Sequence, residues 1–147
     1  MNFILDASVA LLWLAPQTNP TGIDYAASTL NALRQSQAVV PSLFALEIAN
    51  VITKLESKEV VTVADSQRYI AVLERLNVSV DQATASHALG DTLNLARRYK
   101  LSAYDAAYLE LSLRTGLSLA TLDAGLAKAA TTAGVSIFGT RGSNPRP

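Results

Sequence analysis

Four acidic residues stand out in this chain because each lies at the end of an apolar run or early in an apolar segment. Their side chains offer hard oxygen ligands of the kind that Mg²⁺ and Mn²⁺ prefer over zinc. The chain has no cysteine and a single histidine, His87, which excludes zinc fingers, iron–sulfur clusters, thiol nucleophiles and disulfides. The chemistry open to these residues is therefore the binding of a divalent cation. The four are Asp6, Glu47, Asp105 and Asp123.

The elements that must position these acids follow from the apolar pattern, in which strands alternate with helices. This alternation predicts an α/β domain with a mostly parallel sheet. Five strands are expected, over 2–5, 38–40, 77–80, 117–121 and 135–138. Helices are expected over 8–14, 24–35, 42–58, 63–73, 81–99 with an interruption at Gly90-Asp91, 102–115 and 123–133.

The predicted topology places all four acids at one edge of the sheet. In a parallel sheet, the strand C-termini and the first turns of the following helices meet at the same edge, where ligands bind. Asp6 and Asp123 directly follow predicted strands, whereas Glu47 and Asp105 lie early in predicted helices. We therefore expect the four carboxylates to converge.

The helical positions of two of these acids strengthen the expectation. At about 100° per residue, Glu47 falls between Leu43 and Val51 in the apolar stripe of its helix, and Asp105 falls within the apolar stripe of its own. A lone ionised carboxylate facing a core is costly, so such groups are paired, protonated or bound to metal. Neither stripe contains Arg or Lys, so a divalent cation is the simplest partner.

Each acid also has a purely structural interpretation. Asp6 and Asp123 could cap helices, since Asp is a favoured N-cap residue. Ser102 and Asp105 resemble a capping box, although Glu or Gln is the usual partner. Glu47 could face solvent. These interpretations explain each acid separately, whereas convergence of all four at one edge favours a shared site.

Other polar residues receive no role in that site. His87 falls in a helix rich in Ala and Leu, and Asp91 beside Gly90 is expected to be a local cap rather than a fifth ligand. The basic residues of 97–100 are expected to form a solvated helix end, where positive charge suits the helix dipole.

Composition limits the class of protein further. With 147 residues and 50% hydrophobic content, the chain fits a single domain over 1–138, followed by a flexible Gly- and Pro-rich tail over 139–147. Twelve Lys and Arg balance twelve Asp and Glu, which argues against a strongly salt-driven DNA binder. The apolar stretch over 7–15 has no basic start and is far too short to cross a bilayer, so a cytoplasmic protein without membrane contact is expected.

Three segments of the chain resemble PIN-domain ribonucleases of the VapC toxin type, the toxins of type II toxin–antitoxin systems. They are "FILDASVALLWL", "PSLFALEIANVI" and, most specifically, "LSAYDAAYLELSLRTGLSLATLDAGLAKAA". The order and spacing of elements fit this family from Met1 to about Phe138.

The resemblance implies a three-layer α/β/α fold with a five-stranded parallel sheet in the order 3-2-1-4-5. It implies a Mg²⁺- or Mn²⁺-dependent endoribonuclease that forms a homodimer and is held by an antitoxin whose C-terminal segment occupies the active-site groove. The family's acidic quartet, its catalytic and metal-binding residues, corresponds to Asp6, Glu47, Asp105 and Asp123. Ser8 and Thr121 correspond to its supporting polar residues.

Three other functions remain open. The first is a PIN-like binding module without catalysis. The second is a phosphatase of the haloacid-dehalogenase type with Asp6 as nucleophile, which would want an acid where Ser8 stands. The third is a phospho-accepting domain using Asp81 after the third strand, which would want paired acids beside the first strand. The RNA target, the antitoxin, the number of ions, toxicity and the dimer interface are not specified by the sequence.

Overall fold

The computed structural model describes residues 1–139 and contains one parallel sheet of four strands. The strands lie in the order β3-β2-β1-β4, so the predicted α/β class and the relative order of these four strands are confirmed. Phe3 of the central strand pairs with Ala38 on one side and with Ser118 on the other. The strands are β1 (Phe3–Leu5), β2 (Ala38–Val40), β3 (Val78–Val80) and β4 (Ser118–Ala120).

The fifth strand predicted over 135–138 is wrong. Within residues 1–139, this segment makes one isolated parallel bridge, between Ile137 and Leu119 of β4. Gly134 and Gly139 adopt left-handed φ angles of 91° and 72°, so the chain turns on both sides of the segment. The extended run is therefore too short for a full strand, although it lies beside β4, where the strand was expected. The predicted tail over 139–147 lies, apart from Gly139, outside the described residues.

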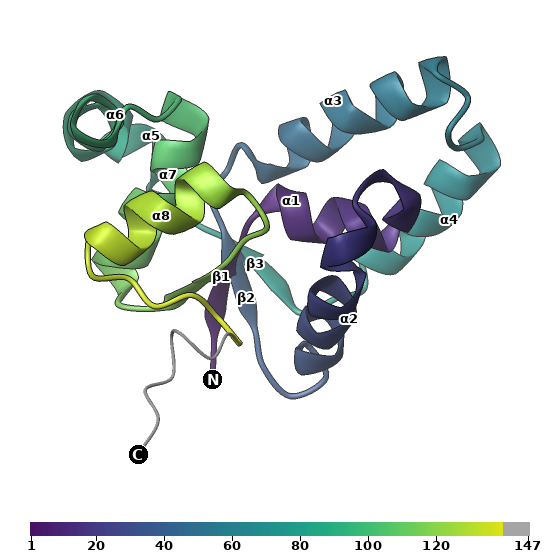
Figure 1. Ribbon diagram of the computed structural model, residues 1–147, viewed down its shortest axis with the longest axis horizontal. Coiled ribbons are helices and arrows are strands. Elements are labelled where there is room, and N and C mark those ends of the chain that lie inside the picture. The colour runs from purple at the N-terminus through teal and green to yellow at the C-terminus, as the bar shows by residue number, and fades with distance from the viewer. Residues whose placement is uncertain (140–147) are drawn as a thin grey trace.

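Helices lie on both sides of the sheet (Figure 1). Those of the first half of the chain, including a long α3–α4 hairpin, lie on one side, and α5 to α8 lie on the other. They are α1 (Ala7–Ala10), α2 (Ile23–Ala32), α3 (Phe44–Ser57), α4 (Val63–Leu73), α5 (Thr84–His87), α6 (Leu93–Tyr99), α7 (Ala103–Thr115) and α8 (Ala124–Thr132). Short 3-10 turns over Leu11–Trp13, Pro16–Thr18 and Pro20–Gly22 follow α1, and a π-helix over Ala88–Thr92, η4, joins α5 to α6.

Helix boundaries follow local chemistry. The Ser102 side chain accepts the Asp105 N–H at the start of α7, and Gly116 ends that helix at a φ of 73°. The helix predicted over 81–99 is interrupted at Gly90-Asp91 as expected, because both residues fall in the π-helix. The helix predicted over 8–14 forms only one α-helical turn before it tightens into a 3-10 turn.

The core is built around β1, which is buried over its whole length. Residues of β4, α7 and α8 pack around it, among them Leu119, Tyr108 and Leu126. Because β1 is fixed from both sides, the residue that follows it is held in one place. None of the helices described in residues 1–139 combines the length and the apolar content that crossing a membrane would require.

Candidate metal centre

Asp6 follows β1 and is held by two hydroxyl groups. Its N–H donates to the Ala120 carbonyl at 2.9 Å, and its carboxylate is buried, with the residue only 4% exposed. The hydroxyls of Ser8 and Thr121 both donate to Oδ2, at 2.6 and 2.7 Å. Since neither hydroxyl binds Oδ1, that oxygen has no side-chain donor among the described residues. Ser8 and Thr121 thus hold the Asp6 carboxylate, whereas their supporting role in a functional site stays a prediction.

The same two hydroxyls connect Asp6 to the segment after β4. Ser8 Oγ accepts the Leu122 N–H and Thr121 Oγ1 accepts the Asp123 N–H, both at 3.0 Å. This hydrogen-bond network joins the C-terminal ends of β1 and β4. It therefore fixes the backbone that carries Asp6 and Asp123.

Asp123 caps helix α8, which confirms its structural interpretation. The cap uses only one of the two carboxylate oxygens. Its Oδ1 accepts the Leu126 N–H at 3.0 Å. Its Oδ2 has no hydrogen-bond donor within residues 1–139, so a cap and a ligand are compatible in one side chain.

Glu47 lies in the first turn of α3 and is bound by a buried tyrosine of α7. The Tyr108 hydroxyl donates to Glu47 Oε1 at 2.5 Å. Tyr108 is 0% exposed, whereas Glu47 is half-buried. The sequence indicated an inward-facing Glu47 but not this partner. The i,i+3 spacing of Asp105 and Tyr108 places both on one side of α7 but does not identify Glu47 as the partner.

Asp105 is the least restrained of the four acids. Its backbone N–H is bonded by Ser102, but its carboxylate makes no hydrogen bond or ion pair with any residue in the described part of the chain. The second bond of the capping box suggested by the sequence, from the Ser102 N–H to the Asp105 carboxylate, is therefore absent among the described residues. Burial, followed by the charges of Asp123 and Asp6, raises the pKa of Asp105 to about 6.

The four acids act on one another electrostatically. Burial raises the pKa of Asp6, where the Ser8 and Thr121 hydroxyls oppose it and the Asp123 charge adds to it. Burial also raises the pKa of Glu47; the Tyr108 hydroxyl opposes this rise, and the charges of Asp6 and Asp105 add to it. The structure thus brings the predicted quartet into one electrostatic neighbourhood.

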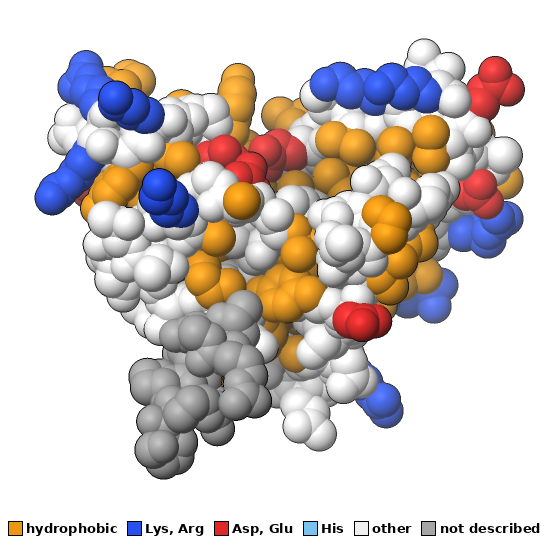
Figure 2. Space-filling view, viewed as in Figure 1, with side chains coloured by type: hydrophobic (Ala, Val, Ile, Leu, Met, Phe, Trp, Pro, Cys, Tyr) orange, Lys and Arg blue, Asp and Glu red, His pale blue; other side chains and the backbone are white. Residues whose placement is uncertain are grey.

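No Lys, Arg or His of the described residues forms an ion pair with the quartet. Among residues 1–139, the ion pairs involve other acids and none of the quartet. Figure 2 shows acidic side chains gathered in a hollow between the α3–α4 hairpin and the side of the molecule that carries α5 to α8. A cluster of uncompensated carboxylates, three of them with one oxygen already fixed, fits a divalent cation.

The quartet is more widely spaced than a closed coordination shell. Within residues 1–139, the one group of three His, Asp or Glu side chains whose ligand atoms all lie within 4.8 Å of one another is His87, Asp91 and Glu110. No three carboxylates of the quartet therefore meet that spacing in the described part of the chain.

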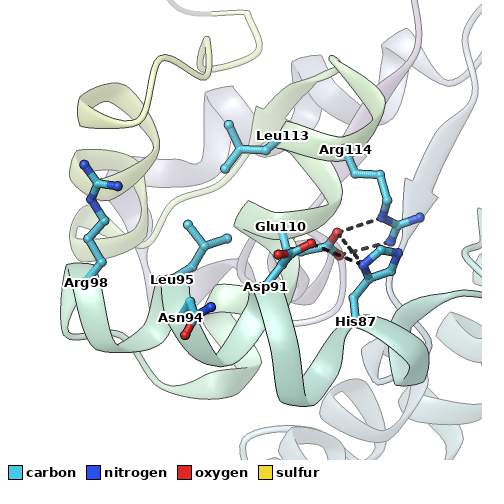
Figure 3. Close-up of a pocket in the computed structure, with 8 residues that line it drawn as sticks. All are labelled: His87, Asp91, Asn94, Leu95, Arg98, Glu110, Leu113 and Arg114. Carbon is cyan, nitrogen blue, oxygen red and sulfur yellow. Dashed lines mark hydrogen bonds and ion pairs between the residues drawn. The ribbon is translucent and has the colours of Figure 1, made fainter.

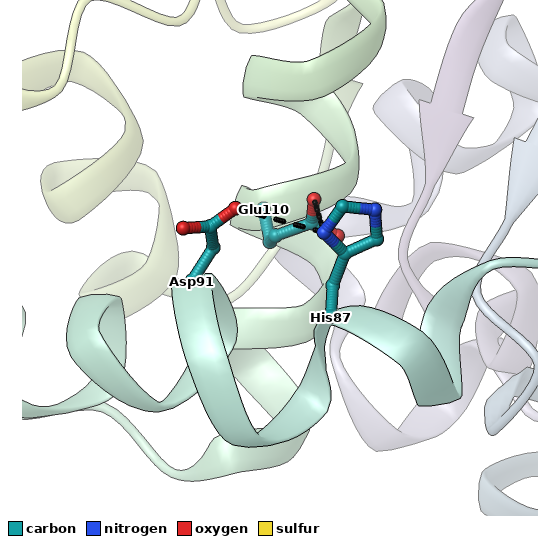
Figure 4. A group of neighbouring side chains, drawn as sticks. All are labelled: His87, Asp91 and Glu110. Atoms are coloured by element: carbon teal, nitrogen blue, oxygen red, sulfur yellow. Dashed lines mark ion pairs between the residues drawn. The ribbon is translucent and has the colours of Figure 1, made fainter.

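The His87 group lines a separate pocket of about 560 Å³ (Figure 3). His87 Nδ1 lies 3.6 Å from both Asp91 Oδ2 and Glu110 Oε2 (Figure 4). Glu110, whose side chain is only 5% exposed, already has a cation, because Arg114 Nε and Nη2 donate to its two oxygens at 2.7 and 3.0 Å. This group therefore belongs to an ion-pair network around Arg114, although its three ligand atoms also lie close enough together to hold a metal ion. Asp91 lies inside η4, so its predicted role as a helix cap is wrong.

Arg114 also neutralises Asp81, the acid that a phospho-accepting domain would use. Its two terminal nitrogens donate to Asp81 at 3.1 and 2.7 Å, and these bonds hold the pKa of Asp81 below its usual value. Asp81 is thereby a structural ion-pair partner.

Comparison with known proteins agrees with the fold. A family model of the PIN domain matches residues 3–131. The crystal structure of PAE2754 from Pyrobaculum aerophilum superposes with a TM-score of 0.63 at 20% identity, covering 90% of this chain and 86% of that chain. VapBC2 from Rickettsia felis, bound to a DNA fragment from their promoter, gives 0.58 at 14% identity, covering 84% and 88%. No curated protein sequence matches the chain. The family model spans most of the sequence and includes all four acids of the quartet, and the chain belongs to the PIN-domain family.

Proposed function

We propose that this protein is a metal-dependent endoribonuclease, the VapC-type toxin of a toxin–antitoxin pair. PIN domains are typically metal-dependent nucleases, and the likeness to VapBC2 supports this branch of the family. The observation that carries the proposal is the carboxylate quartet without ion-pair partners among the described residues, three of whose members have a pKa raised by burial and by neighbouring charges of the quartet.

In this proposal Asp6, Asp105 and Asp123 hold Mg²⁺ or Mn²⁺ directly. Glu47 completes the ligand set or orients the attacking water. Ser8 and Thr121 fix the Asp6 carboxylate, and Asp123 keeps its position because it also caps α8. These residues use oxygen ligands alone, which suits the two ions named.

The bound cation would lower the pKa of water and stabilise the negative charge that builds up during phosphodiester hydrolysis. The chain's own contribution is a set of carboxylates, three of which are held through one oxygen before substrate arrives. In-line attack by water would leave a 5′-phosphate and a 3′-hydroxyl. The positive charge of the ion also allows a chain with zero net charge to bind RNA.

RNA cleavage with Mn²⁺, compared with cleavage in EDTA, tests the activity. We expect Asp105→Asn to lower the cleavage rate by more than about 100-fold, since outer-shell partners of metal sites alone cost 10- to 100-fold. Asp91→Asn is the matched control, because Asp91 lies in the His87 network, and it should cleave like the wild type. Cleavage that persists in EDTA or in Asp105→Asn would refute the mechanism.

We also propose that an antitoxin protein covers this region and that the toxin is a homodimer. Exposed apolar side chains on the α3–α4 hairpin support a protein partner, since Leu46 precedes Glu47 and Val63 and Val72 lie on α4. Co-expression with the protein encoded by the adjacent gene, followed by size-exclusion chromatography, tests both statements. A monomer that captures no such partner would contradict them.

A further inference from the structure

We propose that Tyr108 is a positioning residue of the metal centre, which holds Glu47 by one carboxylate oxygen and leaves the other for the ion. This inference rests on the proposed function and adds to it a residue outside the acidic quartet.

The burial of Tyr108 shows that its hydroxyl needs a partner. The side chain is fully buried in α7, one turn beyond Asp105. A buried hydroxyl is costly unless it is hydrogen-bonded, and Phe would fill the same core space without that cost. The hydroxyl donates to Glu47 Oε1 across 61 residues of sequence, so the bond joins α7 to α3. Core packing explains why a ring stands at position 108, and the bond to Glu47 explains why that ring carries a hydroxyl group.

Tyr108 completes a pattern among the carboxylates. Oδ2 of Asp6 is bound by two hydroxyls, and Oδ1 of Asp123 is bound by the Leu126 N–H. Oε1 of Glu47 is bound by Tyr108. In each case the protein binds one oxygen and leaves the other without a side-chain donor among the described residues. Tyr108 therefore does for Glu47 what Ser8 and Thr121 do for Asp6.

This arrangement matters most for Glu47, whose side chain has more rotatable bonds than Asp. Because Tyr108 already fixes one oxygen, the Glu47 side chain loses less conformational entropy when it binds an ion. It also favours binding through a single oxygen, which suits the strict octahedral geometry of Mg²⁺. Outer hydrogen bonds of this kind orient metal ligands and tune affinity.

Tyr108→Phe tests the inference, because it removes the hydroxyl and keeps the ring. Titration of metal-free protein with Mn²⁺, followed by the electron paramagnetic resonance signal of free Mn²⁺, should show roughly a tenfold rise in Kd. Tyr69→Phe is the matched control: Tyr69 is 8% exposed and its hydroxyl donates to the Ala10 carbonyl at 2.7 Å. We expect its Mn²⁺ Kd to equal that of the wild type.

The same substitution in a Glu47→Ala protein distinguishes a positioning role of Tyr108 from a general effect on core packing. If Tyr108 acts through Glu47, Tyr108→Phe should cause no further rise in Kd when Glu47→Ala is already present. An equal rise in both backgrounds would overturn the inference, because it would show a general effect on the fold.

Glu47→Asp keeps the test independent of how well Tyr108→Phe folds. It retains the charge but shortens the side chain by one methylene, which withdraws the carboxylate from the Tyr108 hydroxyl, so its Mn²⁺ Kd should rise as in Tyr108→Phe. Wild-type affinity in Glu47→Asp or in Tyr108→Phe would reject the positioning role and leave the nuclease proposal standing. A wild-type protein that binds no Mn²⁺ would instead reject the proposed function.

Discussion

Asp105 shows at the scale of one residue how a partly buried carboxylate without a partner lowers stability. Its carboxylate has no partner among the described residues, and burial with two neighbouring charges raises its pKa from 3.8 to about 6. An acid whose pKa is higher in the folded than in the unfolded state holds its proton longer when folded. Its contribution to stability is therefore complete at low pH and declines as the pH rises from about 4 to about 6.

Asp105→Asn should accordingly stabilise the metal-free protein at neutral pH. Solvent screening of this half-exposed group and its favourable place at a helix N-terminus reduce the effect, so we expect a gain of about 1 kcal/mol in the free energy of unfolding at pH 7.5. At pH 4 the gain should nearly vanish. Urea denaturation in EDTA at both pH values measures it, and a gain that is the same at both would contradict the assigned cause.

At the scale of elements, Arg114 joins three parts of the fold. It binds Glu110 on its own helix α7 and Asp81 after β3, and Glu110 also faces His87 at the end of α5. Breaking a buried ion pair by removing one partner leaves the other charge uncompensated. The network therefore contributes to holding the α5–η4 segment against α7.

Arg114→Met should destabilise the protein by about 2–4 kcal/mol, because it leaves Glu110 and Asp81 partly or fully buried without a cation. Arg68→Met is the control, since Arg68 pairs with Asp65 on the surface of α4, and stability should barely change. Chemical denaturation of both variants provides the comparison. Equal effects would show that the Arg114 network is no more than a surface ion pair.

The elements also show what sequence patterns can and cannot predict. Four strands, the long helices and the edge shared by the acids follow from periodicity and from the geometry of parallel crossovers. The bond between Tyr108 and Glu47 and the bond between Arg114 and Asp81 join residues 61 and 33 positions apart. No local pattern encodes such pairs, because they depend on how helices pack. The fifth strand failed for a local reason, since Gly134 and Gly139 turn the chain on both sides of it.

At the scale of the whole molecule, the acidic quartet joins elements from both ends of the described chain. Asp6 follows the first strand, Glu47 lies on the α3–α4 hairpin, and Asp105 and Asp123 belong to the other side of the sheet. An ion that binds only when these parts are assembled stabilises the folded state as a whole. Metal binding should therefore be visible in global unfolding.

At a Mn²⁺ concentration of about 100 times the Kd, one site adds roughly 2.7 kcal/mol to the free energy of unfolding. The gain should fall below pH 6, because protons then compete with Mn²⁺ for Asp105, whose pKa is about 6. Asp6→Asn/Asp105→Asn should abolish it, whereas Asp91→Asn, which alters the tighter but already paired His87 network, should retain it in full. Thermal unfolding of the three proteins with and without Mn²⁺ decides between the two clusters: a gain lost in Asp91→Asn and kept in the double variant would place the ion at His87.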